Sequence, residues 1–268
     1  MSLNLRELMA GYQKDGLSRT MASARVCQDI ILKAIADGPL SRNVTIKGGV
    51  VMRSITNDSR RATRDIDIDF IHYSLNDESI RYFVQKLNII PGISLEIDGE
   101  IEELRHQDYH GKGINIRVTD KSGYSIISKM DIGVHKHLDI EQDEYLFDVC
   151  MSDEGVSLLK NTAEQSFVEK LRSLLKFGSS SRRYKDIYDL YYLKDVLDID
   201  RLNSAMDILV FSDPGMRENN YGDVLARIQQ AFEDKNYLSE VSNSWQRWLD
   251  DDIQDIADGI LTFISDRI

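Results

Sequence analysis

One short stretch of strictly alternating character constrains this chain more than any other. It runs from Thr63 to Phe70 and reads TRDIDIDF. The alternation predicts a β-strand with Asp65, Asp67 and Asp69 on one face and apolar side chains on the other. Carboxylates at positions i and i+2 of a strand lie only about 7 Å apart, so they repel one another unless a positive group lies between them. A hard divalent cation with oxygen ligands meets this need, and the strand therefore predicts a metal site on its acidic face.

A glycine pair precedes this strand. Gly48 and Gly49 follow Lys47, and several arginines lie between the glycines and the acids. Glycine lacks a Cβ, so backbone N–H groups can approach a phosphate closely, above all when a helix follows. An acidic strand face is also typical of the solvated side of a sheet, and a glycine pair of an ordinary turn. The two features in this order favour a site for a nucleoside triphosphate.

This segment resembles the first motif of the nucleotidyltransferase superfamily, and most closely that of the AbiEii/AbiGii toxin family. In that family Lys-Gly-Gly precedes Arg-x-Ser/Thr-x-Asp-x-Asp. The matching residues here are Lys47, Gly48, Gly49, Arg61, Thr63, Asp65 and Asp67. The resemblance implies that the two aspartates hold metal ions and that the other five residues bind the nucleotide. Asp69 has no counterpart in the motif and is expected to be solvated.

A later strand-like run offers a third carboxylate. Residues 125–132 are rich in apolar side chains and carry Asp131 near their end. In a strand beside the acidic strand, Asp131 would supply a third ligand to the same metal ions, and the resemblance places the third acid of the superfamily on such a strand. An acid that caps a turn at a strand end is the alternative. His135 and His137 follow closely, but two lone histidines near a strand end are typical of ordinary surface or hydrogen-bonded groups, and we leave them out of the site.

The distribution of periodic segments predicts the fold class. Strand-like runs alternate with amphipathic helical segments up to about residue 157, and residues 158–268 carry helical patterns separated by short polar breaks. This layout predicts a mixed part of strands and helices over residues 1–157, and the resemblance implies that it is an α+β fold with a nucleotidyltransferase-like mixed sheet and flanking helices. An all-helical domain over residues 158–268 is expected to complete the cleft. Among the single elements, a helix is predicted from Asn76 to Leu87, and another begins after Thr162 as its N-cap.

Two motifs of the helical half also match the toxin family. Residues 169–171 resemble its Glu-Lys-Leu motif, and residues 185–190 its Arg/Lys-Asp-x-Tyr-Asp-Leu motif. The resemblance implies that Lys170 compensates charge on the leaving pyrophosphate, and that Asp186 and Asp189 orient it or a basic group nearby. Lys170 would then contribute charge rather than packing, so Lys170→Met is expected to change stability little. Without the resemblance, the pattern of residues 185–190 favours an ordinary helix with a charged surface and a buried stripe of Tyr and Leu.

Composition narrows the class of protein. The formal net charge of −12 argues against broad, nonspecific binding of nucleic acid, although a local basic patch can hold an RNA. No apolar run is long enough to span a membrane, and the N-terminus lacks the apolar core of a signal peptide. Cys27 and Cys150 are widely separated and follow no metal-ligand spacing, which predicts free thiols and a cytoplasmic protein.

The resemblance implies a Mg²⁺-dependent nucleotidyltransferase of the AbiEii toxin type, which transfers a nucleoside monophosphate from a nucleoside triphosphate to an acceptor hydroxyl. Mg²⁺ would be held by Asp65, Asp67 and Asp131. The partners it implies are an RNA acceptor such as transfer RNA and a cognate antitoxin, in toxin–antitoxin or phage-defence pairs. Three alternatives stay open: an aminoglycoside-type adenylyltransferase, a protein-modifying nucleotidyltransferase and a non-catalytic pseudoenzyme. A binding module has little reason to cluster repelling carboxylates, which argues against the last.

Overall fold

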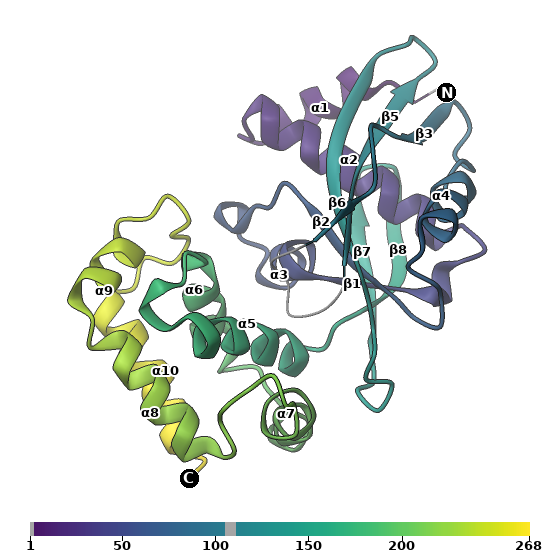
Figure 1. Cartoon of the computed structure of the whole chain (residues 1–268). Helices are drawn as coiled ribbons and strands as arrows, with labels where there is room; N and C mark the ends of the chain where they lie inside the picture. Colours follow the sequence, from purple (N-terminus) through teal and green to yellow (C-terminus); the bar gives the residue numbers. More distant parts are fainter. Residues whose placement is uncertain (1–2, 105–110) are drawn as a thin grey trace. The chain divides into compact units, whose positions relative to one another are not determined.

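The chain divides into two compact units. The computed structural model describes residues 3–104 and 111–268, and the units are Met1–Asn161 and Thr162–Ile268. The division falls a few residues beyond the predicted boundary at residue 157, because the last strand of the first unit extends to Lys160. The first unit combines a sheet with helices and the second is helical (Figure 1). The predicted α+β class, with a helical C-terminal part, is confirmed.

The first unit is built on one mixed sheet. Its strands are β1 (Val44–Lys47), β2 (Ile66–Phe70), β3 (Ile93–Ile97), β4 (Glu102–Glu103), β5 (Lys112–Asp120), β6 (Ser125–Val134), β7 (Asp143–Val149) and β8 (Ser152–Lys160). They lie in the order β3-β5-β6-β2-β1-β8-β7, with β4 paired to β5. The pairs β2–β6 and β1–β8 are parallel, and β1–β2 is antiparallel. The acidic strand β2 thus lies in the middle of the sheet.

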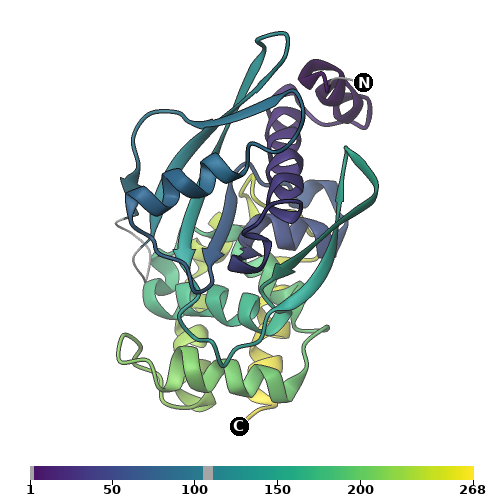
Figure 2. The same cartoon turned by 90° about the vertical axis from the view of Figure 1, so that its right-hand side faces the viewer.

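Helices flank this sheet as the sequence predicts. They are α1 (Leu5–Lys14), α2 (Arg19–Ala36), α3 (Gly48–Thr56) and α4 (Asp77–Lys86). Helix α2 runs along the sheet (Figure 2), packs against β6, β7 and β8, and buries an apolar stripe that includes Ile30, Ile31 and Ile35. Helix α4 begins as predicted, because the Asn76 side chain accepts a hydrogen bond from the backbone N–H of Ser79. Helix α3 starts at the glycine pair, so a helix does follow it.

The second unit consists of short helices around its own apolar core. They are α5 (Ala163–Phe177), α6 (Tyr184–Leu193), α7 (Ile199–Met206), α8 (Tyr221–Phe232), α9 (Lys235–Ser242) and α10 (Ile253–Ser265). The predicted cap of α5 is present, since Thr162 Oγ1 accepts a hydrogen bond from Gln165 N at 3.0 Å. Tyr188 is fully buried and donates its hydroxyl proton to the carbonyl of Val241. Within the described residues, each helix is too short or too polar to cross a membrane.

Several groups left outside the predicted site have ordinary surroundings. His135 is buried, and its Nε2 lies 3.1 Å from the carbonyl oxygen of Ile140. His137 is exposed. Cys27 is buried, Cys150 is exposed, and both are free thiols as predicted.

Candidate active site

The sheet brings the predicted acids together. Strands β2 and β6 are parallel neighbours, and Asp67 lies opposite Asp131 in their register. Asp65 precedes β2 by one residue and is exposed, whereas Asp67 is half-buried. Burial raises the pKa of the Asp67 carboxyl, and the negative charges of Asp131 and Asp65 raise it further against a lowering by Lys47. The three carboxylates therefore lie close enough to act on one another.

The chemistry of this donor set suits a divalent cation. Carboxylate oxygens are the ligands that Mg²⁺ takes in proteins, and a cation between Asp67 and Asp131 would relieve the repulsion that raises the pKa of Asp67. In their present positions, no three His, Cys, Asp or Glu side chains of the described residues form a group that could hold a metal ion. Side-chain movement is needed before all three aspartates can bind one cation.

A lysine that the sequence analysis missed provides positive charge here. Lys129 Nζ lies 2.9 Å from Asp131 Oδ1 and 3.1 Å from Oδ2. Burial lowers the pKa of the Lys129 ammonium, but the hydrogen bond to Asp131 and the charges of Asp131, Asp65 and Asp67 outweigh it and raise the pKa. The signal was in the sequence, because residues 129 and 131 share one face of a strand. The Lys129 ammonium thus supplies positive charge beside Asp131, as a bound metal ion would.

The two glycines allow the start of α3 to pack on the acidic segment. Gly48 has a φ of +62°, and a Cβ there would lie 2.2 Å from Asp67 Oδ2. A Cβ on Gly49 would lie 2.4 Å from Thr63 Oγ1. The N–H of Gly49 points to Asp67 Oδ2 across a long 3.5 Å contact. The positive end of the α3 dipole thus faces a carboxylate, in a position that also suits a phosphate.

Lys47, a predicted nucleotide ligand, forms a buried ion pair in the structure. Its Nζ lies 2.7 Å from Asp69 Oδ1, and the two side chains are only 8% and 5% exposed. The expectation that Asp69 is solvated is therefore wrong. The physical reason is that Lys47 lies on β1, next to β2, and supplies the compensating charge that permits burial. Lys47 also lowers the pKa of Asp67, so its charge acts on both acids.

Arg61 and Thr63 are both buried. The carbonyl of Thr63 accepts a hydrogen bond from Gln28 Nε2 at 3.0 Å. On the next residue, the carbonyl of Arg64 accepts one from Ser128 Oγ at 3.1 Å. The segment that leads into β2 is thus held by α2 and by β6. Gln28 was missed, although a polar side chain amid the buried stripe of α2 is a signal for such a role.

Within the helical unit, the structure brings Lys170, Asp186 and Asp189 together. Lys170 Nζ lies 3.2 Å from Asp186 Oδ1 and 2.7 Å from Asp189 Oδ2, and all three side chains are buried. Asp189 also accepts a hydrogen bond from Trp248 Nε1 at 3.1 Å. Removing the ammonium would take a cation away from two buried carboxylates, although Asp186 Oδ2 keeps Arg183 Nε at 2.7 Å. We therefore expect Lys170→Met to lower stability, in contrast to the expectation from the sequence.

Comparisons with known proteins identify a family for this chain. The model of the family described as nucleotidyl transferase AbiEii toxin, type IV TA system, matches residues 30–262. A crystal structure of an antigenic nucleotidyltransferase-like protein from Paracoccidioides brasiliensis is 12% identical, with 82% of this chain and 91% of that chain covered and a TM-score of 0.45. That likeness is too slight to carry a conclusion. No functionally curated protein matches the chain. Because the family model extends through both units, the chain belongs to the AbiEii nucleotidyltransferase toxin family.

Proposed function

We propose that this protein transfers a nucleoside monophosphate from a nucleoside triphosphate to an acceptor hydroxyl. The observation that carries the proposal is the position of Asp67, which lies opposite Asp131 on a parallel neighbour strand and against the glycine start of α3. Carboxylates and a helix N-terminus at one point suit a triphosphate that arrives with a divalent cation. In the reaction, the acceptor oxygen attacks the α-phosphorus in line, and pyrophosphate leaves.

The three acids are assigned to the metal ion. Asp65, Asp67 and Asp131 would hold Mg²⁺, which would neutralise phosphate charge and lower the pKa of the attacking hydroxyl. Burial raises the pKa of the Asp67 carboxyl most, and the charges of Asp131 and Asp65 raise it further, so a cation beside these acids would relieve an unfavourable negative charge. Lys129 now pairs with Asp131, so it has to yield that carboxylate when the cation binds.

The nucleotide would bind beside the acids. Gly48 and Gly49 let the start of α3 pack directly against Asp67 and Thr63, and we assign phosphate binding to the N–H groups of this helix start beside the acids. Lys47 keeps the surrounding potential less negative through its ion pair with Asp69. Arg61 and Thr63 are buried, and we assign them the shaping of this phosphate site.

The assignment of Lys170 to the same reaction rests on its family motif. Lys170 would compensate charge on the leaving pyrophosphate, and Asp186 and Asp189 would hold its ammonium in place. As a family member, the protein would act as the toxin of a toxin–antitoxin pair, in the cytoplasm where nucleoside triphosphates occur. An RNA acceptor such as transfer RNA, a cognate antitoxin and a part in phage defence belong to this proposal.

Transfer of a labelled α-phosphate to an acceptor tests this proposal. The protein is incubated with each α-³²P-labelled triphosphate and Mg²⁺, together with total RNA, total protein or aminoglycosides in separate reactions. The proposal expects label in one acceptor fraction, and loss of that label in Asp65→Asn/Asp67→Asn. Label on protein or aminoglycoside would replace the RNA acceptor. Absence of label with every triphosphate, together with intact nucleotide binding, would make the protein a pseudoenzyme.

A further inference from the structure

A hollow of about 320 Å³ in the first unit carries two arginines on its lining. Its walls come from the end of α1 and the loop after it, the N-terminal half of α2, the end of α3 with the loop after it, and β7. It shares Thr63 with the candidate active site, but Asp65, Asp67 and Asp131 do not line it. Its volume is within the usual range of small-molecule sites, about 300–1,000 Å³. The proposed transfer reaction makes no use of this hollow.

Arg53, on α3, has hydrogen-bond donors without an acceptor at this hollow. Its Nη1 donates a hydrogen bond to Gln28 Oε1, but its Nε and Nη2 are buried and form no hydrogen bond with any described residue. These two nitrogens form one edge of the planar guanidinium, and the parallel N–H groups of such an edge match the two oxygens of a carboxylate. Buried donors without an acceptor are unfavourable, above all on a charged group. Arg53 is therefore suited to hold an anionic group that enters the hollow.

The charges around Arg53 also favour an anion at this point. Burial lowers the pKa of its guanidinium to about 10, and the charge of Arg25 contributes to the lowering, whereas Asp29 and Asp148 act in the other direction. Asp29 already has partners, since its Oδ1 lies 3.0 Å from Arg25 Nε and its Oδ2 accepts a hydrogen bond from the hydroxyl of Tyr12. A further anion beside Arg53 would therefore compensate a charge that the nearby carboxylates compensate only in part.

The exposed part of the lining is acidic. Asp15 and Asp148 line the hollow and are exposed. A third acid of the lining, Asp58, pairs with Arg60, whose Nη2 lies 2.9 Å from its Oδ2. Exposed carboxylates repel a polyanion such as a nucleic acid or a nucleoside triphosphate, and they attract an ammonium group. Partly exposed apolar side chains such as Met21 also belong to the lining. A buried cation, exposed acids and an apolar part together suit a small zwitterion.

We propose that this hollow binds a small zwitterion of the class of free α-amino acids. Its carboxylate binds the edge of Arg53 formed by Nε and Nη2, its ammonium group faces Asp148, and its side chain packs on the apolar part of the lining. Because both nitrogens are shielded from solvent, the ligand has to shift a side chain of the lining as it enters. Binding of this ligand does not depend on the proposed transfer reaction.

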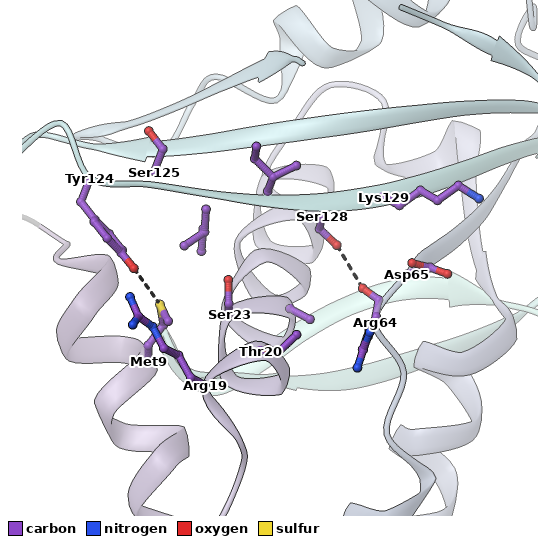
Figure 3. A pocket seen from close by; sticks show the side chains of 13 residues that line it. Met9, Arg19, Thr20, Ser23, Arg64, Asp65, Tyr124, Ser125, Ser128 and Lys129 are labelled. Atoms are coloured by element: carbon purple, nitrogen blue, oxygen red, sulfur yellow. Dashed lines mark hydrogen bonds between the residues drawn. The ribbon is translucent and has the colours of Figure 1, made fainter. Parts of the chain in front are cut away.

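Hydrogen bonds connect Arg53 to the segment that carries the first acid. Gln28 accepts the hydrogen bond of Arg53 Nη1, and its Nε2 lies 3.4 Å from the carbonyl oxygen of Asp65. One residue earlier, the carbonyl of Arg64 accepts a hydrogen bond from Ser128 Oγ at 3.1 Å (Figure 3). A carboxylate that fixes the guanidinium therefore also fixes the Gln28 amide and the backbone of Asp65. This effect of the ligand on the candidate active site, unlike its binding, rests on the proposed function.

Thermal melting and titration calorimetry with the unaltered protein test the site. The proteinogenic L-amino acids are compared by their effect on the melting temperature, and each one that raises it is titrated in the absence of nucleotide. At least one amino acid is expected to bind. Its amide, which lacks the carboxylate, and its N-acetyl derivative, which lacks the ammonium group, are each expected to bind about tenfold more weakly or worse. Inorganic phosphate and acetate serve as anions without an ammonium group.

Three protein variants locate the bound amino acid. Arg53→Lys keeps a positive charge but loses the planar edge, so the affinity should fall by about tenfold. Asp148→Asn changes an exposed side chain and should weaken binding by about threefold, as expected for loss of an exposed ion pair. Asp139→Asn, which alters an exposed acid of the same unit outside the hollow, should bind like the wild type. If Arg53→Lys unfolds, the comparison of Asp148→Asn with Asp139→Asn still decides the question.

The site would be disproved if no amino acid bound, if the amide or phosphate bound as tightly as the amino acid, or if Asp148→Asn and Asp139→Asn had equal affinities. Electron paramagnetic resonance of Mn²⁺ tests the connection through Gln28. Saturation with the amino acid should raise the Mn²⁺ affinity by about fivefold, and this gain should be absent in Gln28→Met. A gain that persists in Gln28→Met would overturn the connection. Failure of the proposed function would appear differently, as Mn²⁺ binding that survives in Asp65→Asn/Asp67→Asn.

Discussion

Gly48 and Asp67 lie so close that a methyl group on the glycine α-carbon would stand 2.2 Å from the carboxylate oxygen. The contact joins the start of α3 to the strand that carries the acids. Glycine is needed here for two reasons. One is this close contact, and the other is that φ at this residue is +62°, a value that L side chains adopt at a cost of about 1–2 kcal/mol. The structural and the functional need for glycine can therefore be separated by experiment.

Gly48→Ala is expected to destabilise the protein and to weaken metal–nucleotide binding, since the new methyl group displaces Asp67. The control is Gly123→Ala, which has a similar φ of +80° but open space around the added Cβ. Both variants introduce backbone strain, but only Gly48→Ala moves the carboxylate of Asp67. Calorimetric titration with a Mg²⁺–nucleotide, beside thermal melting, measures the two effects. Equal nucleotide affinity in the two variants would remove Asp67 from the site.

A second prediction compares the acids in β2 with the one just before it. Asp65→Asn/Asp67→Asn should abolish metal-dependent nucleotide binding without loss of stability, because neutralising Asp67 removes its repulsion with Asp131. Asp69→Asn should leave nucleotide binding intact and lower stability. It removes the carboxylate that lies 2.7 Å from the buried ammonium of Lys47, at a cost of about 1–3 kcal/mol. Urea unfolding and nucleotide titration of both variants distinguish the roles, and a strong loss of stability in the first would contradict the assignment.

The third prediction concerns Lys129, whose ammonium pairs with Asp131. Because this charge repels an incoming cation, Lys129→Met should raise the affinity for Mn²⁺ alone by about tenfold, or about 1.4 kcal/mol. Electron paramagnetic resonance of free Mn²⁺ measures that affinity without nucleotide or turnover. Lys86→Met, on α4, is the control for loss of a lysine charge. An unchanged or weaker Mn²⁺ affinity in Lys129→Met would mean that its ammonium does not compete with the cation.

The sequence predicted those features that depend on neighbours along the chain. The helix predicted from Asn76 and the cap predicted at Thr162 follow from local pattern, and the structure has both. Helix α3 escaped prediction because two glycines and a β-branched pair, Val50 and Val51, disfavour a helix, and tertiary packing overrides that propensity. The β7–β8 hairpin was missed because acidic residues interrupt its alternation and Gly155 bends it at a φ of +72°.

Some features of the candidate site could also be predicted from the sequence, and others depend on the fold. The pairing of Asp67 with Asp131 could be expected from the family motif and the strand pattern together. The roles of Gln28, Lys129 and the buried Asp69 depend on partners that only the fold brings near, such as the carbonyl of Thr63 for Gln28. No local pattern specifies such partners, because the same residue types are solvated in most strands and helices.

The last prediction separates charge from packing in the helical unit. Lys170→Met should lower stability by about 3–5 kcal/mol, because Asp189 is fully buried and loses the ammonium 2.7 Å away. A loss of activity in this variant alone would therefore be uninformative. The double variant Lys170→Met/Asp189→Asn removes both charges and keeps an amide oxygen that can accept the hydrogen bond of Trp248 Nε1. It should recover much of the stability. If Lys170 compensates charge on pyrophosphate, turnover stays reduced by about a hundredfold in this stable variant. Recovery of turnover together with melting temperature would give Lys170 a purely structural role.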